Sequence, residues 1–206
     1  MNFSNRVSLI DLFNYIDTED YAVVKLNENF PNYLEGSDID IFCENVRLLS
    51  QKIIYFGLRY LSESTSITVY TINEKHLQID FIFDGNLDIK FDVYGKFPDY
   101  EKFKIKAEFF HEIIENVVRY KDLVKVPSCI DELIIRYLEY LEYFNVRNDK
   151  IKHLYYVQNA LTDPELEDFF YKKLYRITAF PERKRVDPIL YLEKIKIRVF
   201  TFLHKE

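Results

Sequence analysis

The stretch Gly36-Ser37-Asp38-Ile39-Asp40-Ile41 alternates two carboxylates with two branched apolar residues. In a β-strand, residues i and i+2 point to the same face of the sheet. The two aspartates are therefore expected to project together, while the isoleucines enter the core. The glycine lets a phosphate approach the backbone, and the serine offers a hydroxyl and an N–H group. Residues 37–43 thus predict a half-buried strand whose polar face holds a hard divalent cation and a phosphate.

The segments around this strand have the pattern of an α+β fold. Alternating apolar residues predict further strands, and apolar residues at helical spacing predict flanking helices. Strands are expected at residues 21–26, 66–72, 76–83 and 87–94, and helices at residues 4–16 and 46–56. The turn Asp84-Gly85-Asn86 makes the last two strands antiparallel neighbours. We therefore expect a mixed, mostly antiparallel sheet with helices beside it.

From about residue 106 onward the apolar pattern is helical, and this half is expected to be an all-helical C-terminal domain. Ser128-x-x-Asp131 has the pattern of a helix N-terminus. Asp163-Pro164 and Asp187-Pro188 each place a capping residue before a proline, which suits the first helical position. Pro98 and nearby charged residues interrupt the pattern, so we divide the chain into domains 1–100 and 101–206.

A third carboxylate is expected from a neighbouring strand, either to complete a metal site or to accept a proton. Asp80 shares a polar face with His76, and Asp92 shares one with Lys90. Both aspartates remain candidates, and Asp80 is preferred. The competing interpretation is that all these acids form the solvated side of an antiparallel sheet.

Composition excludes several classes of function. The net charge of −6 argues against broad nucleic-acid binding, which requires lysine and arginine to neutralise phosphates. Cys43 and Cys129 form no metal-binding pattern, so reduced thiols and a cytoplasmic location are expected. No apolar run is long enough to span a membrane. The sequence leaves the oligomeric state undetermined.

Three segments together resemble the DNA polymerase beta-like nucleotidyltransferase superfamily. They read YAVVKLNENFPNYLEGSDIDIF (21–42), HLQIDFIF (76–83) and LDIKFDVYG (87–95). Within this superfamily they look most like small bacterial nucleotidyltransferase-family proteins of surface-polysaccharide biosynthesis. The resemblance implies that Asp38 and Asp40 bind Mg²⁺ or Mn²⁺ and that Asp80 or Asp92 is the third carboxylate. It also implies an NTP substrate.

The loop before the aspartates departs from the superfamily pattern. Many members carry Gly-Ser or Gly-Gly upstream of the paired aspartates, where it cradles the triphosphate, but this chain has Val24-Lys25-Leu26-Asn27. Gly36, Ser37 and Lys25 are therefore the expected phosphate contacts. A basic group at residues 147–153, which includes Lys152, is expected to reach phosphate or base across the cleft. Solvated surface lysines are the alternative interpretation.

These observations give three functional hypotheses. The first is a Mg²⁺-dependent nucleotidyltransferase that moves a nucleoside monophosphate from an NTP to a hydroxyl or phosphate of a small-molecule or glycan-precursor acceptor. The second is a non-catalytic or antitoxin-like protein with the same fold, suggested by the missing Gly-Ser loop. The third is an adenylyl-transferring resistance enzyme that acts on a small aminated sugar.

Overall fold

The structure is a computed structural model that describes residues 3–4, 6–27, 29–60 and 64–179. Its centre is a five-stranded sheet made of β2 (Tyr21–Val24), β4 (Ser37–Cys43), β5 (Thr65–Asn73), β6 (His76–Phe83) and β7 (Asn86–Tyr94). The strands lie in the order β2-β4-β7-β6-β5, and all neighbours are antiparallel except β4 and β7, which run parallel. The prediction of a mixed, mostly antiparallel sheet is confirmed.

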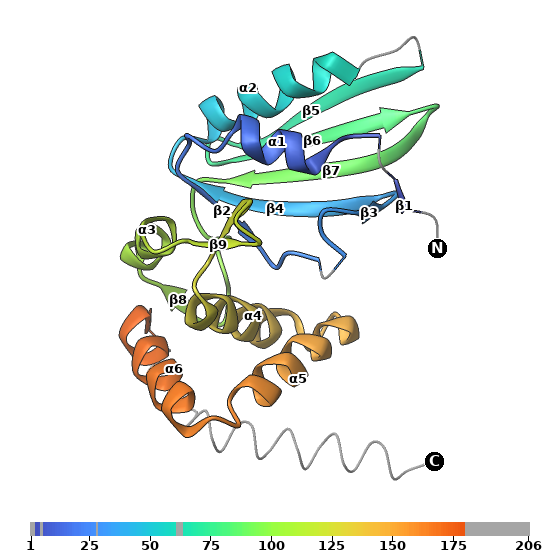
Figure 1. The fold of residues 1–206 in the computed structure, drawn as a ribbon. Coiled ribbons are helices and arrows are strands. Elements are labelled where there is room, and N and C mark those ends of the chain that lie inside the picture. Colours follow the sequence, from blue (N-terminus) through green and yellow to red (C-terminus); the bar gives the residue numbers. More distant parts are fainter. Residues whose placement is uncertain (1–2, 5, 28, 61–63, 180–206) are drawn as a thin grey trace, which may run out of the picture.

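One face of the sheet is covered by α1 (Leu9–Tyr15) and α2 (Val46–Gly57), as Figure 1 shows. Ser8 caps α1 by accepting a hydrogen bond from the Asp11 N–H at 3.3 Å, so this helix begins later than its apolar pattern predicts. Between the helices and the sheet lies a core of branched and aromatic side chains. It includes Leu12, Phe13, Ile41, Leu49, Ile53, Ile79, Phe81, Phe91 and Val93.

Four more helices follow the sheet, which makes six α-helices in the described residues. They are α3 (Ala107–Glu115), α4 (Cys129–Tyr143), α5 (Ile151–Ala160) and α6 (Pro164–Ile177). As expected, Ser128 and Asp163 cap α4 and α6 through their side-chain oxygens. The helix start expected at Asp187-Pro188 lies outside the described residues.

The expectation of an all-helical second half is wrong, because short strands interrupt it. A hairpin joins β9 (Val118–Tyr120) to β10 (Val124–Val126), and β8 (Lys104–Ile105) pairs with β11 (Thr178–Ala179). Three residues separate the two strands, and the first two of them, Lys121 and Asp122, have positive φ angles of 51° and 55°, which are common in tight hairpin turns. Val124 of this hairpin is buried in the same core as the side chains between the sheet and the helices α1 and α2.

Further short elements complete the described chain. They are β1 (Phe3–Ser4), which pairs with β3 (Tyr33–Leu34), and the 3₁₀ turns η1 (Leu58–Tyr60) and η2 (Asn148–Lys150). No described helix is both long and apolar enough to cross a bilayer.

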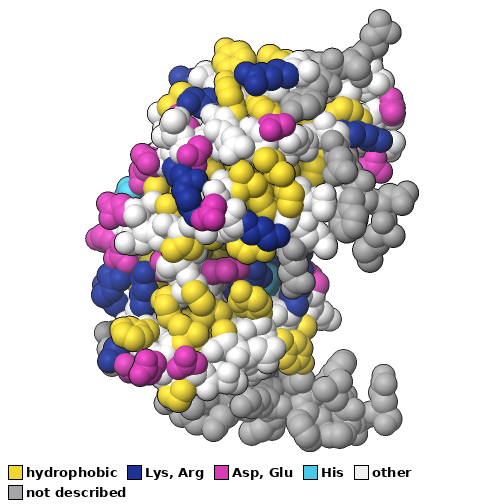
Figure 2. Space-filling view, viewed as in Figure 1, with side chains coloured by type: hydrophobic (Ala, Val, Ile, Leu, Met, Phe, Trp, Pro, Cys, Tyr) yellow, Lys and Arg dark blue, Asp and Glu magenta, His cyan; other side chains and the backbone are white. Residues whose placement is uncertain are grey.

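The second face of the sheet is split between packing and polar surface. Ala22, Val24 and Phe42 pack into a second core together with α3, α4, α5 and α6. Beyond them, four charged side chains on this face of β4 and β7 line a cleft, namely Asp38, Asp40, Lys90 and Asp92. Acidic and basic side chains alternate over the side of the molecule drawn in Figure 2, without a large field of one sign.

Candidate functional site

Three carboxylates on one face of the two parallel strands line the same cleft. The pairing of β4 with β7 places Asp40 directly opposite Asp92 and Asp38 opposite Lys90. Asp38 is largely exposed, whereas Asp92 is only 6% exposed. Asp38, Asp40 and Asp92 all line a cleft of about 290 Å³ between the sheet and α4. The predicted strand therefore presents its aspartates toward a cavity.

Asp80 lies away from this cleft. Strand β6 is one position further out than β7, and its register places Asp80 opposite Lys90 and Gln78 opposite Asp92. The Asp80 carboxylate accepts a hydrogen bond of 2.9 Å from the Gln78 amide. The geometry thus favours Asp92, the alternative candidate, over the preferred Asp80, because β7 rather than β6 is the neighbour of β4.

The turn before β4 depends on a glycine. Gly36 has a φ angle of +79°, in the left-handed region that side chains disfavour. Its N–H donates to the Asp88 carbonyl at 2.8 Å, which attaches the turn to β7. The Ser37 hydroxyl accepts a hydrogen bond from the Leu34 N–H at 3.1 Å, so it stabilises this turn.

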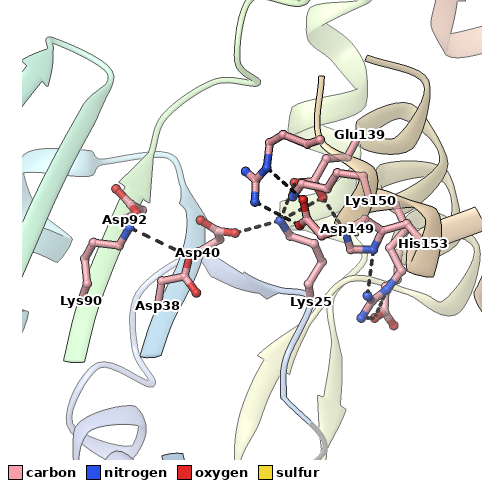
Figure 3. A network of polar contacts seen from close by, with 12 residues as sticks. Lys25, Asp38, Asp40, Lys90, Asp92, Glu139, Asp149, Lys150 and His153 are labelled. Atoms are coloured by element: carbon pink, nitrogen blue, oxygen red, sulfur yellow. Dashed lines mark hydrogen bonds and ion pairs between the residues drawn. The ribbon is translucent and has the colours of Figure 1, made fainter. Parts of the chain in front are cut away.

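Lys25 connects the two walls of the cleft, as Figure 3 shows. Its Nζ lies 2.9 Å from Oδ2 of Asp40 and 3.1 Å from Oε2 of Glu139 on α4. Burial alone would lower the pKa of Lys25, but the two carboxylates outweigh it and raise the pKa. Lys25 also has a φ angle of 58°, a conformation that costs free energy for a residue with a side chain. Lys25, the predicted phosphate contact, therefore has a strained backbone and forms ion pairs with both walls of the cleft.

The helical wall is centred on Glu139. Besides Lys25, it accepts a hydrogen bond of 2.6 Å from Lys150, and Nε2 of His153 lies 3.4 Å from Oε2 of Glu139. Burial alone would raise the pKa of Glu139, but Lys25 and Lys150 outweigh it and lower the pKa to about 2. Burial lowers the pKa of His153 to about 4, and its neighbouring cations oppose protonation further. Glu139 is thus an anion surrounded by cations, beside a neutral histidine.

The sheet wall contains a second set of ion pairs. The Nζ of Lys90 lies 3.0 Å from Oδ2 of Asp92 and 3.9 Å from Oδ2 of Asp38. Nε2 of His76 lies 2.9 Å from the other oxygen of Asp92, and the His76 ring stacks on Tyr94 at 4.1 Å between centroids. Asp92 is therefore oriented from two sides.

Burial raises the pKa of Asp40, and repulsion from Asp38 and Asp92 acts in the same direction. Lys25 offsets only part of this rise. A carboxylate that is crowded by other carboxylates is stabilised by any additional cation that enters the cleft. The acidic side of the cleft therefore favours a cationic ligand electrostatically.

Only part of the predicted basic group at residues 147–153 faces the cleft. Arg147 and Lys150 line the cleft, whereas Lys152 is exposed on α5 and does not line it. Lys150 therefore takes the place that the sequence pattern suggested for Lys152. The reason is that α5 begins at Ile151, so the 3₁₀ turn η2 directs Lys150 inward before the helix starts.

The donor atoms suit a hard divalent cation, because three carboxylates on one face supply the oxygen ligands that Mg²⁺ prefers. In the side-chain arrangement observed, however, Lys25 and Lys90 pair with these oxygens. Across the described residues, no group of three or more His, Cys, Asp or Glu side chains is arranged to hold a metal ion. The site thus fits Mg²⁺ in its chemistry, and a bound cation would compete with the lysines.

Glu139 and Tyr94 are site residues that the sequence analysis did not identify. Glu139 is an acid inside the otherwise apolar stripe of α4, flanked at helical spacing by Ile135 and Tyr143. An acid in such a stripe is a detectable signal, since a charged side chain is seldom buried without a partner. Tyr94 continues the alternation of Lys90 and Asp92, but its position at the cleft depends on tertiary packing.

Comparisons with known proteins give no relative for this chain. Neither models of protein families, nor curated protein sequences, nor solved structures match it.

Proposed function

We propose that this protein is a divalent-cation-dependent nucleotidyltransferase with the polymerase beta-like fold and a helical C-terminal domain. The single observation that carries the proposal is the placement of Asp38, Asp40 and Asp92 on one face of the parallel strands β4 and β7, at the edge of a cleft. Two aspartates at i and i+2, joined by a third from the next strand, are suited to phosphoryl transfer.

In this proposal the three aspartates would hold Mg²⁺ or Mn²⁺, which supplies charge neutralisation for the phosphoryl oxygens when bound. Lys25, Lys150 and Arg147 would hold the triphosphate of the NTP, in place of the missing Gly-Ser loop. The lysines lie within the same cleft as the acids, so they are able to exchange a carboxylate partner for a phosphate. The cleft would then act mainly by positioning and electrostatic stabilisation.

The acceptor is proposed to be a hydroxyl or phosphate of a small molecule or glycan precursor, with pyrophosphate as the second product. Tyr94, Tyr100 and Tyr143 line the cleft and offer ring faces for a base or a sugar. A role in surface-polysaccharide biosynthesis is part of this proposal.

A direct test measures pyrophosphate release with each of the four NTPs, in Mg²⁺ or Mn²⁺, across a panel of sugar phosphates and sugar alcohols. The expected result is release with at least one pair of NTP and acceptor that is lost in Asp40→Asn. Release that Asp40→Asn leaves unchanged would contradict the proposal. Asp80→Asn is the matched control, because its carboxylate lies on the same face but outside the cleft.

One observation favours the alternative of a non-catalytic nucleotide-binding protein. Lys25 and Lys90 already neutralise Asp40 and Asp92, and no metal-holding group is arranged among the described side chains. Calorimetry separates the two functions. NTP binding of equal strength with Mg²⁺ and with EDTA, without turnover of any acceptor, would support the binding protein over the enzyme.

A further inference from the structure

A second cavity of about 440 Å³ lies outside the acidic cleft and is the larger of the two. Its walls are the segment 95–106, which connects β7 to α3, and the first turn of α3. Only Pro98 and Tyr100 line both cavities. The two spaces are therefore neighbours that share one wall and differ in all their other lining residues.

The wall of this second cavity includes aromatic side chains. Phe97, Phe103 and Phe110 line it and are each no more than 8% exposed. The ring of Phe97 packs edge-on against that of Phe110 at 5.9 Å between centroids, so these rings support each other. Rigid aromatic rings of this kind suit the apolar part or the ring face of a small molecule.

The remaining charged lining residues give this cavity a positive charge. Lys96, Lys104 and Lys106 line it and are exposed, and the only acid among the lining residues is Asp99. The three lysines and the one aspartate sum to a formal charge of +2, on a chain whose net charge is −6. Asp99 pairs with Lys96 at 2.7 Å. In the described part of the chain, no ion pair is formed by Lys104 or Lys106.

The start of α3 adds to this positive potential. Lys106 precedes the helix, and its side chain makes no capping hydrogen bond. The Phe109 N–H donates to the Lys106 carbonyl at 3.1 Å, whereas the Lys106 side chain accepts from none of the first N–H groups of α3, whose residue Ala107 also lines the cavity. Uncapped N–H groups at a helix start favour an anion.

We propose that this second cavity binds a phosphate monoester carried on a ring-bearing small molecule. Lysines bind phosphate as point charges, whereas planar carboxylates are matched best by arginine, which is absent from these lining residues. A phosphate monoester near pH 7 carries a charge approaching −2, which complements the +2 of the lining. The aromatic rings accept the ring of the ligand. The inference does not depend on the transferase activity proposed for the acidic cleft.

The test is calorimetry on the full chain with phenyl phosphate, methyl phosphate and phenol at low ionic strength. Phenyl phosphate is expected to bind most tightly, because it alone contacts both the lysines and the rings. Lys104→Gln and Lys106→Gln should each weaken it roughly threefold to fivefold. Lys172→Gln is the control, because it removes the same charge at an exposed position of α6 that does not line the cavity, and it should leave binding unchanged.

Asp38→Asn distinguishes the two cavities. Of these two cavities, Asp38 lines only the acidic cleft, so phenyl phosphate should bind this variant as it binds the wild type. Binding that survives in the double variant Lys104→Gln/Lys106→Gln but changes in Asp38→Asn would move the ligand to the acidic cleft and overturn the proposal. Equal binding of phenyl phosphate and phenol would also overturn it, because the lysines would then play no part.

Discussion

The two faces of the central sheet are built from the same strands and have opposite properties. On the face under α1 and α2, Ile41 of β4 and Phe91 of β7 are completely buried among apolar neighbours. One residue earlier on β4 and one later on β7, Asp40 and Asp92 face the cleft. Because the side-chain period of a strand is two, adjacent residues serve entirely different purposes. The face under α1 and α2 is packed into the core, whereas the part of the opposite face that lines the cleft is free to carry chemistry.

The largest effect that would test this comparison is on activity. Under the proposed function, Asp40→Asn removes a metal-ligating charge worth several kcal/mol in the transition state, so transfer should slow about a thousandfold. Pyrophosphate release by the purified variant measures this loss. Its free energy of unfolding should change little beyond the loss of the ion pair with Lys25. An unfolded variant would show that the cleft face also determines the fold, and would contradict the comparison.

The neighbouring residue should behave in the opposite way. Ile41→Ala empties part of the core under α1 and α2, and it should lower the free energy of unfolding by about 2–5 kcal/mol. Urea denaturation followed by circular dichroism measures the change. The folded fraction should retain its transfer rate, because Ile41 does not line the cleft. A large loss of rate in the folded fraction would show that the two faces are not independent.

The pH dependence of stability tests the helical wall of the cleft. His153 is buried, with a pKa of about 4 in the folded chain, against about 6.5 when unfolded. Since the unfolded chain binds this proton first, the contribution is fully present above pH 6.5 and is lost as the pH falls toward 4. The total loss is about 3 kcal/mol. Urea titrations at intervals between pH 7 and pH 4 should show this slope in the wild type and a shallower one in His153→Gln.

A smaller effect on the free energy of unfolding is expected at Gly57, where α2 packs against the sheet. A Cβ atom added at Gly57 would lie 2.2 Å from a ring carbon of Phe81, which is buried. Gly57→Ala should therefore destabilise the fold by about 1–3 kcal/mol, partly offset by better helix propensity in α2. Ser50→Ala, on the same helix, is the matched control. The Ser50 hydroxyl is buried without a hydrogen-bond partner among the described atoms, so its removal should be neutral or stabilising. Thermal denaturation distinguishes these outcomes.

Local patterns were sufficient to predict most of the sheet. Residues 37–43 and 76–83 form strands with the bounds expected from their alternation, because one face of each is buried and the period of two is visible in the sequence. Alternation also placed Asp38 and Asp40 on one face. The strands expected at 66–72 and 87–94 are present and slightly longer.

Contacts between residues that are far apart in the sequence could not be predicted from local patterns. Whether Asp80 or Asp92 joins β4 depends on strand order, and the parallel pairing of β4 with β7 leaves no local signal in either strand. The hairpin of β9 and β10 was missed because it has only three residues in each strand. The role of Glu139 depends on the position of α4 across the cleft from the sheet, and the apolar pattern of a helix does not specify that position.

The link between Lys25 and Glu139 spans 114 residues of chain, and this separation bears on how the protein is made. Synthesis on the ribosome proceeds from the N-terminus, so all five strands of the central sheet emerge before α4 does. Contacts between such distant residues also form slowly, because a long loop must close first. A nascent chain that stalls after β7 has emerged and before α4 is made is therefore expected to contain a complete sheet whose aspartates lack α4 opposite them.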